Sequence, residues 1–106
     1  MTDNVIESGA NVFADLDIPN PEEHLAKAAL AAEISKEIVA RKLTQKVAGD
    51  IMGIDQPKVS ALMRGQLSGF TMDRLVSLLN TLDLDVDITV NPKPASRSRA
   101  RTKVHV

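Results

Sequence analysis

Two apolar patterns that meet at a glycine in the middle of the chain constrain its fold most. Residues 44–65 read TQKVAGDIMGIDQPKVSALMRG. Gly53 permits the positive φ that ends a helix and turns the chain. The small or apolar residues that recur around this turn at helical spacing are Ala48, Gly49, Met52, Ile54, Val59 and Leu62. The stretch therefore predicts two short helices joined by a tight turn.

Capping residues support this prediction. Thr44 and Asp55 are suited to begin the two helices, because a short side-chain oxygen can accept from the free N–H groups of a first turn. Pro57 is tolerated in the first turn of the second helix. Ala48 and Gly49 keep the first helix thin where the second crosses it. This arrangement is typical of a helix-turn-helix, whose second helix lies in the major groove of DNA, so double-stranded DNA is the predicted partner.

The exposed positions of the second helix supply candidate base contacts, because Val59 and Leu62 are predicted to face the core. Glutamine can bond adenine, lysine can donate to guanine, and alanine can contact a thymine methyl. The candidate base-reading residues are Gln56, Lys58, Ser60 and Ala61. The candidate phosphate contacts, at helix ends and in the following loop, are Thr44, Gln45, Lys46, Arg64 and Ser68. An ordinary solvated face is the alternative for Gln56, Lys58 and Arg64.

Further helices are predicted on both sides of this motif. Asn20 is a suitable N-cap and Pro21 a suitable first residue for a helix that continues to about Arg41. Thr71 caps another helix, whose apolar stripe is Leu75, Val76, Leu79 and Leu82. Phe70 is predicted to plug the core. At 106 residues the chain matches one domain, and the prediction is a mainly α fold of four to five helices over residues 20–90.

Residues 84–90 change to a period of two, which is typical of a half-buried strand. A lone strand in a helical chain leaves backbone groups unpaired, so it needs a mate. The same strand of a second subunit would provide one, through Leu84, Val86, Ile88 and Val90. The prediction is a homodimer joined by this strand. An extended segment laid over its own core is the alternative.

Charge is distributed unevenly along a chain whose net charge is -1. Residues 1–19 form an acidic arm, interpreted as flexible or as a segment that docks through Phe13 and Leu16. Residues 91–106 form a basic tail, predicted to be disordered, that either adds phosphate contacts or maintains solubility. Between them, residues 41–74 carry six basic and three acidic side chains, a local balance that favours contact with phosphate.

Other classes of function find little support in the sequence. There is no cysteine, and His24 and His105 belong to no metal-binding or catalytic motif. The prediction is therefore no catalysis, no metal and no cofactor. No run of about 18 apolar residues or secretory signal appears, so a cytoplasmic protein without a membrane partner is expected.

The motif at residues 43–65, followed by LSGFTMDRLVSLLNTLDLDVDI, resembles the phage-repressor and Cro-like (XRE-type) helix-turn-helix family. More narrowly, it is similar to the branch that contains antitoxin-type regulators. The resemblance covers about Glu22 to Val90 and implies a transcriptional repressor that binds a palindromic operator as a homodimer. It also implies an alternative, an antitoxin that neutralises a toxin protein and regulates its own operon. In the family, Gln45 would brace Gln56; Pro57 departs from the family pattern, in which a polar reader is common.

Overall fold

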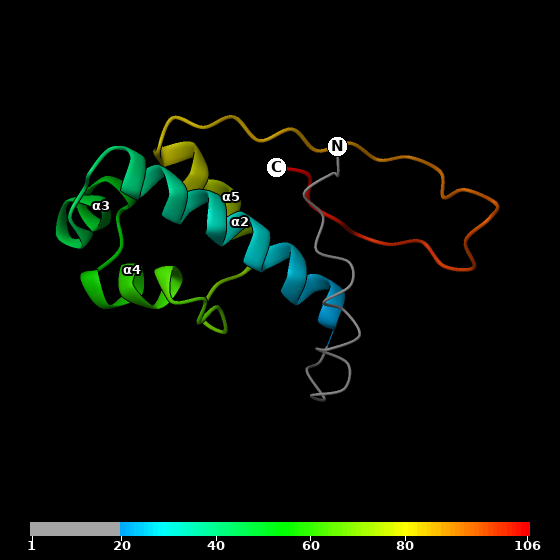
Figure 1. Cartoon of the computed structure of the whole chain (residues 1–106), viewed down its shortest axis with the longest axis horizontal. Coiled ribbons are helices and arrows are strands. Elements are labelled where there is room, and N and C mark those ends of the chain that lie inside the picture. The colour runs from blue at the N-terminus through cyan, green and yellow to red at the C-terminus, as the bar shows by residue number, and fades with distance from the viewer. Residues whose placement is uncertain (1–19) are drawn as a thin grey trace.

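The computed structural model describes residues 20–106, and this part of the chain contains four helices (Figure 1). They are α2 (Pro21–Ala40), α3 (Gln45–Met52), α4 (Gln56–Met63) and α5 (Met72–Thr81). The long helix α2 packs against both α5 and α4, and α3 packs against α4. The mainly α fold and the two short helices are thus confirmed. The predicted acidic arm, residues 1–19, lies outside the described residues.

Each helix begins at its predicted N-cap. The side chain of the cap accepts a hydrogen bond from a backbone N–H in the first turn, which satisfies a donor that has no partner inside the helix. These bonds join Asn20 to Glu23 N (3.3 Å), Thr44 to Val47 N (3.1 Å), Asp55 to Lys58 N (3.0 Å) and Thr71 to Arg74 N (3.1 Å). The boundaries of the helices therefore follow from short polar side chains at four positions.

The two longer helices end in the same way and are joined there. Lys42 and Asp83, which follow α2 and α5, adopt the left-handed conformation. The next residue in each case, Leu43 or Leu84, donates its N–H back to a carbonyl of the last turn, as in a Schellman motif. The guanidinium of Arg41 donates to the carbonyl oxygen of Leu82. One side chain thus ties the end of α2 to the end of α5.

The core lies between α2 and the three shorter helices. Val59 and Leu62 of α4 and Phe70 of the following loop are buried, as predicted. The largest side chains with almost no exposed surface are Ile34, Ile38, Val59, Leu62, Leu75, Leu78 and Leu82. Among the described residues, the core is aliphatic apart from Phe70 and Met52. Ala32 lies outside it, on an exposed face of α2.

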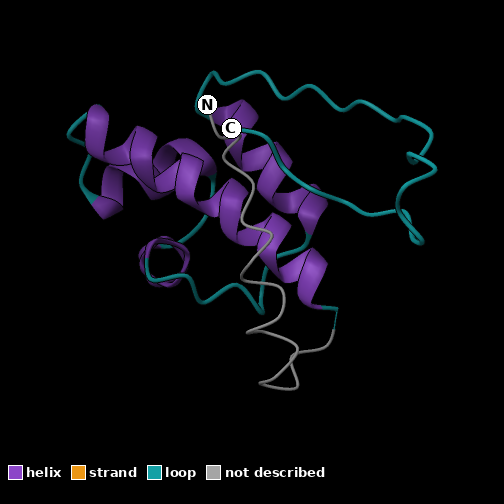
Figure 2. Cartoon of the chain, turned by 45° about the vertical axis from the view of Figure 1, so that its right-hand side comes forward, coloured by secondary structure: helices purple, strands orange, loops and turns teal. Residues whose placement is uncertain are grey.

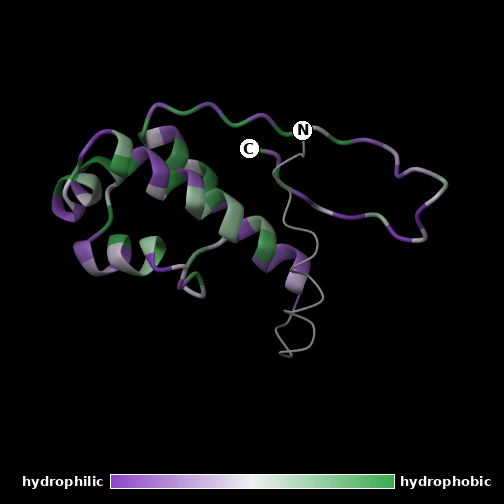
Figure 3. Cartoon of the chain, in the orientation of Figure 1, coloured by the Kyte–Doolittle hydropathy of each residue, from purple (hydrophilic) through white to green (hydrophobic). Residues whose placement is uncertain are grey.

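Residues 84–90 do not form a strand in the single chain, whose described part contains helices and loops alone (Figure 2). Leu84 and Val86 pack against the core, which agrees with the alternative of a segment laid over its own domain. Ile88 and Val90 are 78% and 92% exposed, so the alternating hydropathy seen in Figure 3 continues beyond the packed part. Because a strand here needs a mate from outside this chain, intersubunit pairing stays a prediction.

The basic tail, residues 91–106, contains no helix or strand and turns back toward α2 (Figure 1). The backbone N–H of Thr102 donates to the carboxylate of Glu22, and Val104 packs against the core. The side of the domain that carries residues 84–90 therefore also receives the end of the tail.

Replacing Gly49 with alanine should test the close crossing of α3 and α4. A Cβ at this position would lie 2.5 Å from the backbone oxygen of Ile54 and 3.3 Å from Cγ2 of Val59. Because the nearer atom is backbone, Gly49→Ala should lower the free energy of unfolding by about 1–3 kcal/mol, measured by urea denaturation. Gly69→Ala is the matched control, since its Cβ would meet nothing within 4 Å. Equal stability of the two variants would contradict this packing.

Candidate nucleic-acid interface

The turn between α3 and α4 fixes how the two helices cross. The carbonyl oxygen of Gly49 accepts from both Gly53 N (2.7 Å) and Ile54 N (3.0 Å). Gly53 has a φ of 73°, a conformation in which a side chain would be strained. Ala48 and Gly49 are buried beneath the crossing. The turn therefore depends on two glycines that serve different purposes, one for its backbone angle and one for its missing side chain.

Helix α4 is anchored along one side and exposed at its beginning. Val59 and Leu62 are 0% and 1% exposed and hold the helix against the core. Gln56, Pro57 and Lys58, its first three residues, are all exposed. In Figures 1 and 2, α4 lies on the opposite side of α2 from residues 84–90. The first turn of α4 is thus held from behind by the core, and no other described segment covers it.

The structure divides the four candidate base-reading residues into two pairs. The side chains of Gln56 and Lys58 are exposed and have no hydrogen-bond partner among the described residues. Their donors and acceptors are therefore available to a ligand. Ser60 and Ala61 are half-buried on the flanks of the helix. Those two offer less surface to a base than Gln56 and Lys58 do.

Of the five candidate phosphate contacts, four are exposed: Thr44, Lys46, Arg64 and Ser68. Lys46 forms a salt bridge with Asp50 (3.6 Å), but both side chains are at least 70% exposed. Such a pair contributes little stability, so the lysine can exchange this partner for a phosphate at small cost. The Nε of Arg64 donates to the carbonyl oxygen of Ser60 (3.3 Å), and the terminal nitrogens of its guanidinium have no partner within residues 20–106.

Gln45, the fifth candidate, is half-buried and does not brace Gln56 in this structure. Its side-chain nitrogen lies 4.0 Å from the sulfur of Met63. The start of α3 therefore lies beside the end of α4, whereas Gln56 is at the beginning of α4, roughly 10 Å away along the axis. The brace implied by the family resemblance is replaced by a contact with Met63. Sequence reasoning missed this residue, although it follows Val59 at the i+4 spacing of one helix face.

Among residues 20–106, no group of three or more acidic, histidine or cysteine side chains is placed to hold a metal ion. No helix in that range is long and apolar enough to cross a membrane. The site described above consists of exposed polar and basic side chains on two short helices. Such donors are suited to contact with a polar or negatively charged surface.

Comparison with known proteins agrees with this geometry. A family model described as a helix-turn-helix domain matches residues 12–91, so the chain belongs to the helix-turn-helix domain family. A solved structure named "Putative XRE Family Transcriptional Regulator" is 45% identical in sequence, with a TM-score of 0.76. The similarity covers 81% of this chain and 97% of that one. The motif is therefore of the XRE type. No curated protein sequence matched the chain.

Proposed function

We propose that this protein represses transcription by binding a palindromic operator as a homodimer, with one copy of α4 in the major groove of each half-site. Membership of the helix-turn-helix family and similarity to an XRE-family regulator support DNA-binding regulation in general. The observation that carries the finer proposal is the first turn of α4. Gln56 and Lys58 are exposed there and have no side-chain partner in the described part of the chain, and the helix that carries them is held by the buried Val59 and Leu62.

The chemistry of these side chains assigns them separate tasks. Gln56 suits adenine and Lys58 suits guanine, and each good contact discriminates by about 1–3 kcal/mol. Thr44, Lys46, Arg64 and Ser68 surround the reading turn with groups that bind phosphate, which sets the position of α4 on the duplex without reading sequence. Gln45 would act through its backbone at the start of α3.

Because α4 carries few side chains that can contact bases, specific binding requires two subunits. Helix α4 has eight residues, so it spans about 12 Å and covers only a few base pairs. Pro57 has no side-chain donor or acceptor, although it is exposed in the reading turn. Two subunits held with half-sites about one helical turn apart would double the contacts. Specificity then depends on the spacing between the subunits as well as on Gln56 and Lys58.

Residues 84–90 are the proposed dimer contact. The exposed side chains of Ile88 and Val90 would be covered by pairing with the same segment of a second subunit. Pairing would also satisfy backbone groups that an isolated extended segment leaves to water. Because this segment lies across α2 from α4 (Figure 1), the pairing leaves the reading turn open.

Lys58→Ala and Lys46→Ala should have different effects on DNA binding. Selection of bound sequences from a random DNA pool would first define a cognate site. Lys58→Ala should then weaken binding to that site by about 1–3 kcal/mol and relax the preference at one base pair. Lys46→Ala should weaken cognate and scrambled DNA alike and lower the salt slope by about 1. Equal losses on both DNAs for Lys58→Ala would make it a phosphate contact and remove its reading role.

Ile88→Asp should separate the subunits without unfolding them. The side chain is 78% exposed in the single chain, so the variant should change the free energy of unfolding by no more than about 0.5 kcal/mol. A charged side chain among the apolar side chains of the paired face should oppose the pairing and shift the protein to monomer in sedimentation equilibrium. Ile88→Val, which keeps an apolar side chain at this position, is the control and should leave the dimer intact. A dimer that survives Ile88→Asp would contradict the proposed contact.

A further inference from the structure

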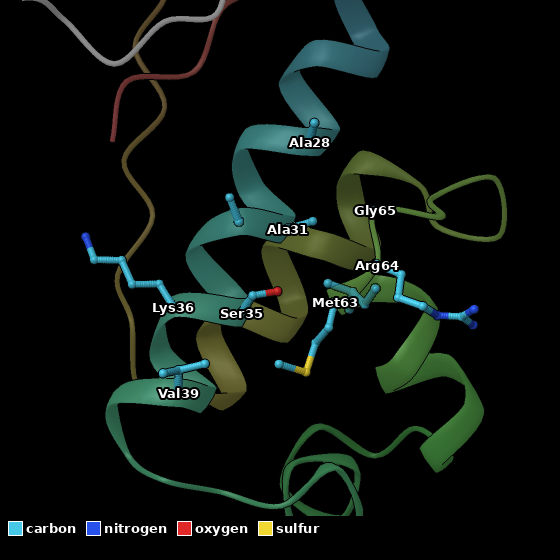
Figure 4. Close-up of a pocket in the computed structure, with 10 residues that line it drawn as sticks. Ala28, Ala31, Ser35, Lys36, Val39, Met63, Arg64 and Gly65 are labelled. Carbon is cyan, nitrogen blue, oxygen red and sulfur yellow. The ribbon is translucent and has the colours of Figure 1, made fainter.

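A groove between α2 and the end of α4 shares only Arg64 with the proposed DNA contact. It has a volume of about 600 Å³ (Figure 4). Its walls carry small or flexible apolar side chains from the two helices, among them Ala28, Ala32, Val39 and Met63. Val39 is 66% exposed, so this apolar surface faces solvent. The groove therefore offers room for a bulky apolar group.

Basic side chains lie on both sides of the groove. Lys36 extends from α2 and Arg64 from the end of α4, on opposite sides of the opening (Figure 4). Neither forms a salt bridge with any described residue. The surroundings thus favour an occupant that combines apolar side chains with negative charge.

Residues 1–19 have this composition and are attached to the helix that forms one wall. They contain four acidic and no basic side chains. The last eight residues of the segment place the apolar Phe13, Leu16 and Ile18 among Asp15 and Asp17. Phe13 is one of only two aromatic residues in the chain, and the other, Phe70, is buried in the core.

The length of the segment is sufficient to reach the groove. Ala28 and Ala32 lie eight and twelve residues into the chain from Asn20, which corresponds to roughly 12 and 18 Å along a helix. The seven residues from Phe13 to Asn20 span up to about 23–25 Å when extended. Phe13 can therefore lie over either alanine if the segment runs back along α2.

We propose that residues 12–18 dock into the groove of their own chain, with Phe13 over the small side chains of α2. The family model begins at residue 12, which supports assigning this segment to the domain. A second copy or another protein would have to compete with a segment that is covalently attached. A short tether of this kind corresponds to an effective concentration on the order of millimolar.

Methyl NMR of the full-length chain tests this docking. The ring of Phe13 should shift the alanine methyl signals of Ala28 and Ala32 upfield, and Phe13→Ala should abolish that shift. The methyl signal of Ala48, which is buried beneath the α3–α4 crossing, should stay in place and report an intact fold. Val5→Ala, an apolar truncation outside residues 12–18, is the control and should leave all three signals unchanged.

Three results would overturn the proposal. The first is identical Ala28 and Ala32 signals in the wild type and Phe13→Ala. The second is a shift that depends on protein concentration and survives Phe13→Ala, which would assign the groove to a second copy. The third is Ala28 and Ala32 methyl signals that shift only when another protein is added, which would assign the groove to that partner.

Cross-linking provides an independent measurement, because the chain has no cysteine. The double variant Ala14→Cys with Ala32→Cys keeps Phe13 and should form an intramolecular disulfide, which requires the two Cα atoms to approach within about 7 Å. The pair Ala14→Cys with Ser77→Cys places the second thiol on an exposed position of α5 and should remain largely reduced. Equal oxidation of the two pairs, or a product that is mainly intermolecular, would contradict docking within one chain.

Discussion

The close approach of α3 and α4 at Gly49 is the contact on which the rest of the structure depends. With the position of a Gly49 Cβ only 2.5 Å from the backbone oxygen of Ile54, no other residue fits without moving the turn. That turn determines the direction of α4. The buried side chains of Val59 and Leu62 then hold the helix in that direction. The position of the exposed first turn therefore follows from one missing side chain and two apolar anchors.

The contacts that stabilise the domain and the residues proposed to contact DNA bases lie on different sides of α2. On one side, Arg41 joins the ends of α2 and α5, and Leu84 and Val86 cover the core. On the other, α4 exposes Gln56 and Lys58. A contact between subunits at residues 84–90 can thus form without covering the reading turn. In the proposed regulator, this separation lets the dimer set the spacing of two copies of α4, each of which can contact only a few base pairs.

Local chemistry explains which features the sequence predicted. The four N-caps, the turn at Gly53 and the buried face of α4 each depend on residues within one or two turns of helix, and the structure confirms them. For α5 the predicted stripe is confirmed at Leu75, Leu79 and Leu82, whereas Val76 is half-buried and Leu78, which was not predicted, is buried. Contacts between residues far apart in the sequence could not be predicted in this way. The Gln45 contact with Met63 and the groove beside Ala32 depend on how helices cross in three dimensions. The strand at residues 84–90 depends on a second subunit, and it stays a prediction together with the antitoxin branch and its toxin partner.

Footprinting with dimethyl sulfate on a selected DNA site tests the central claim most directly, because this reagent methylates guanine at N7 in the major groove and adenine at N3 in the minor groove. If α4 reads the major groove in two half-sites, the protein should protect guanine N7 in two patches about 10 base pairs apart, on one face of the duplex. Adenine N3 between the patches should stay reactive. Protection confined to adenine N3, or none at guanine N7 under saturating protein, would contradict the account.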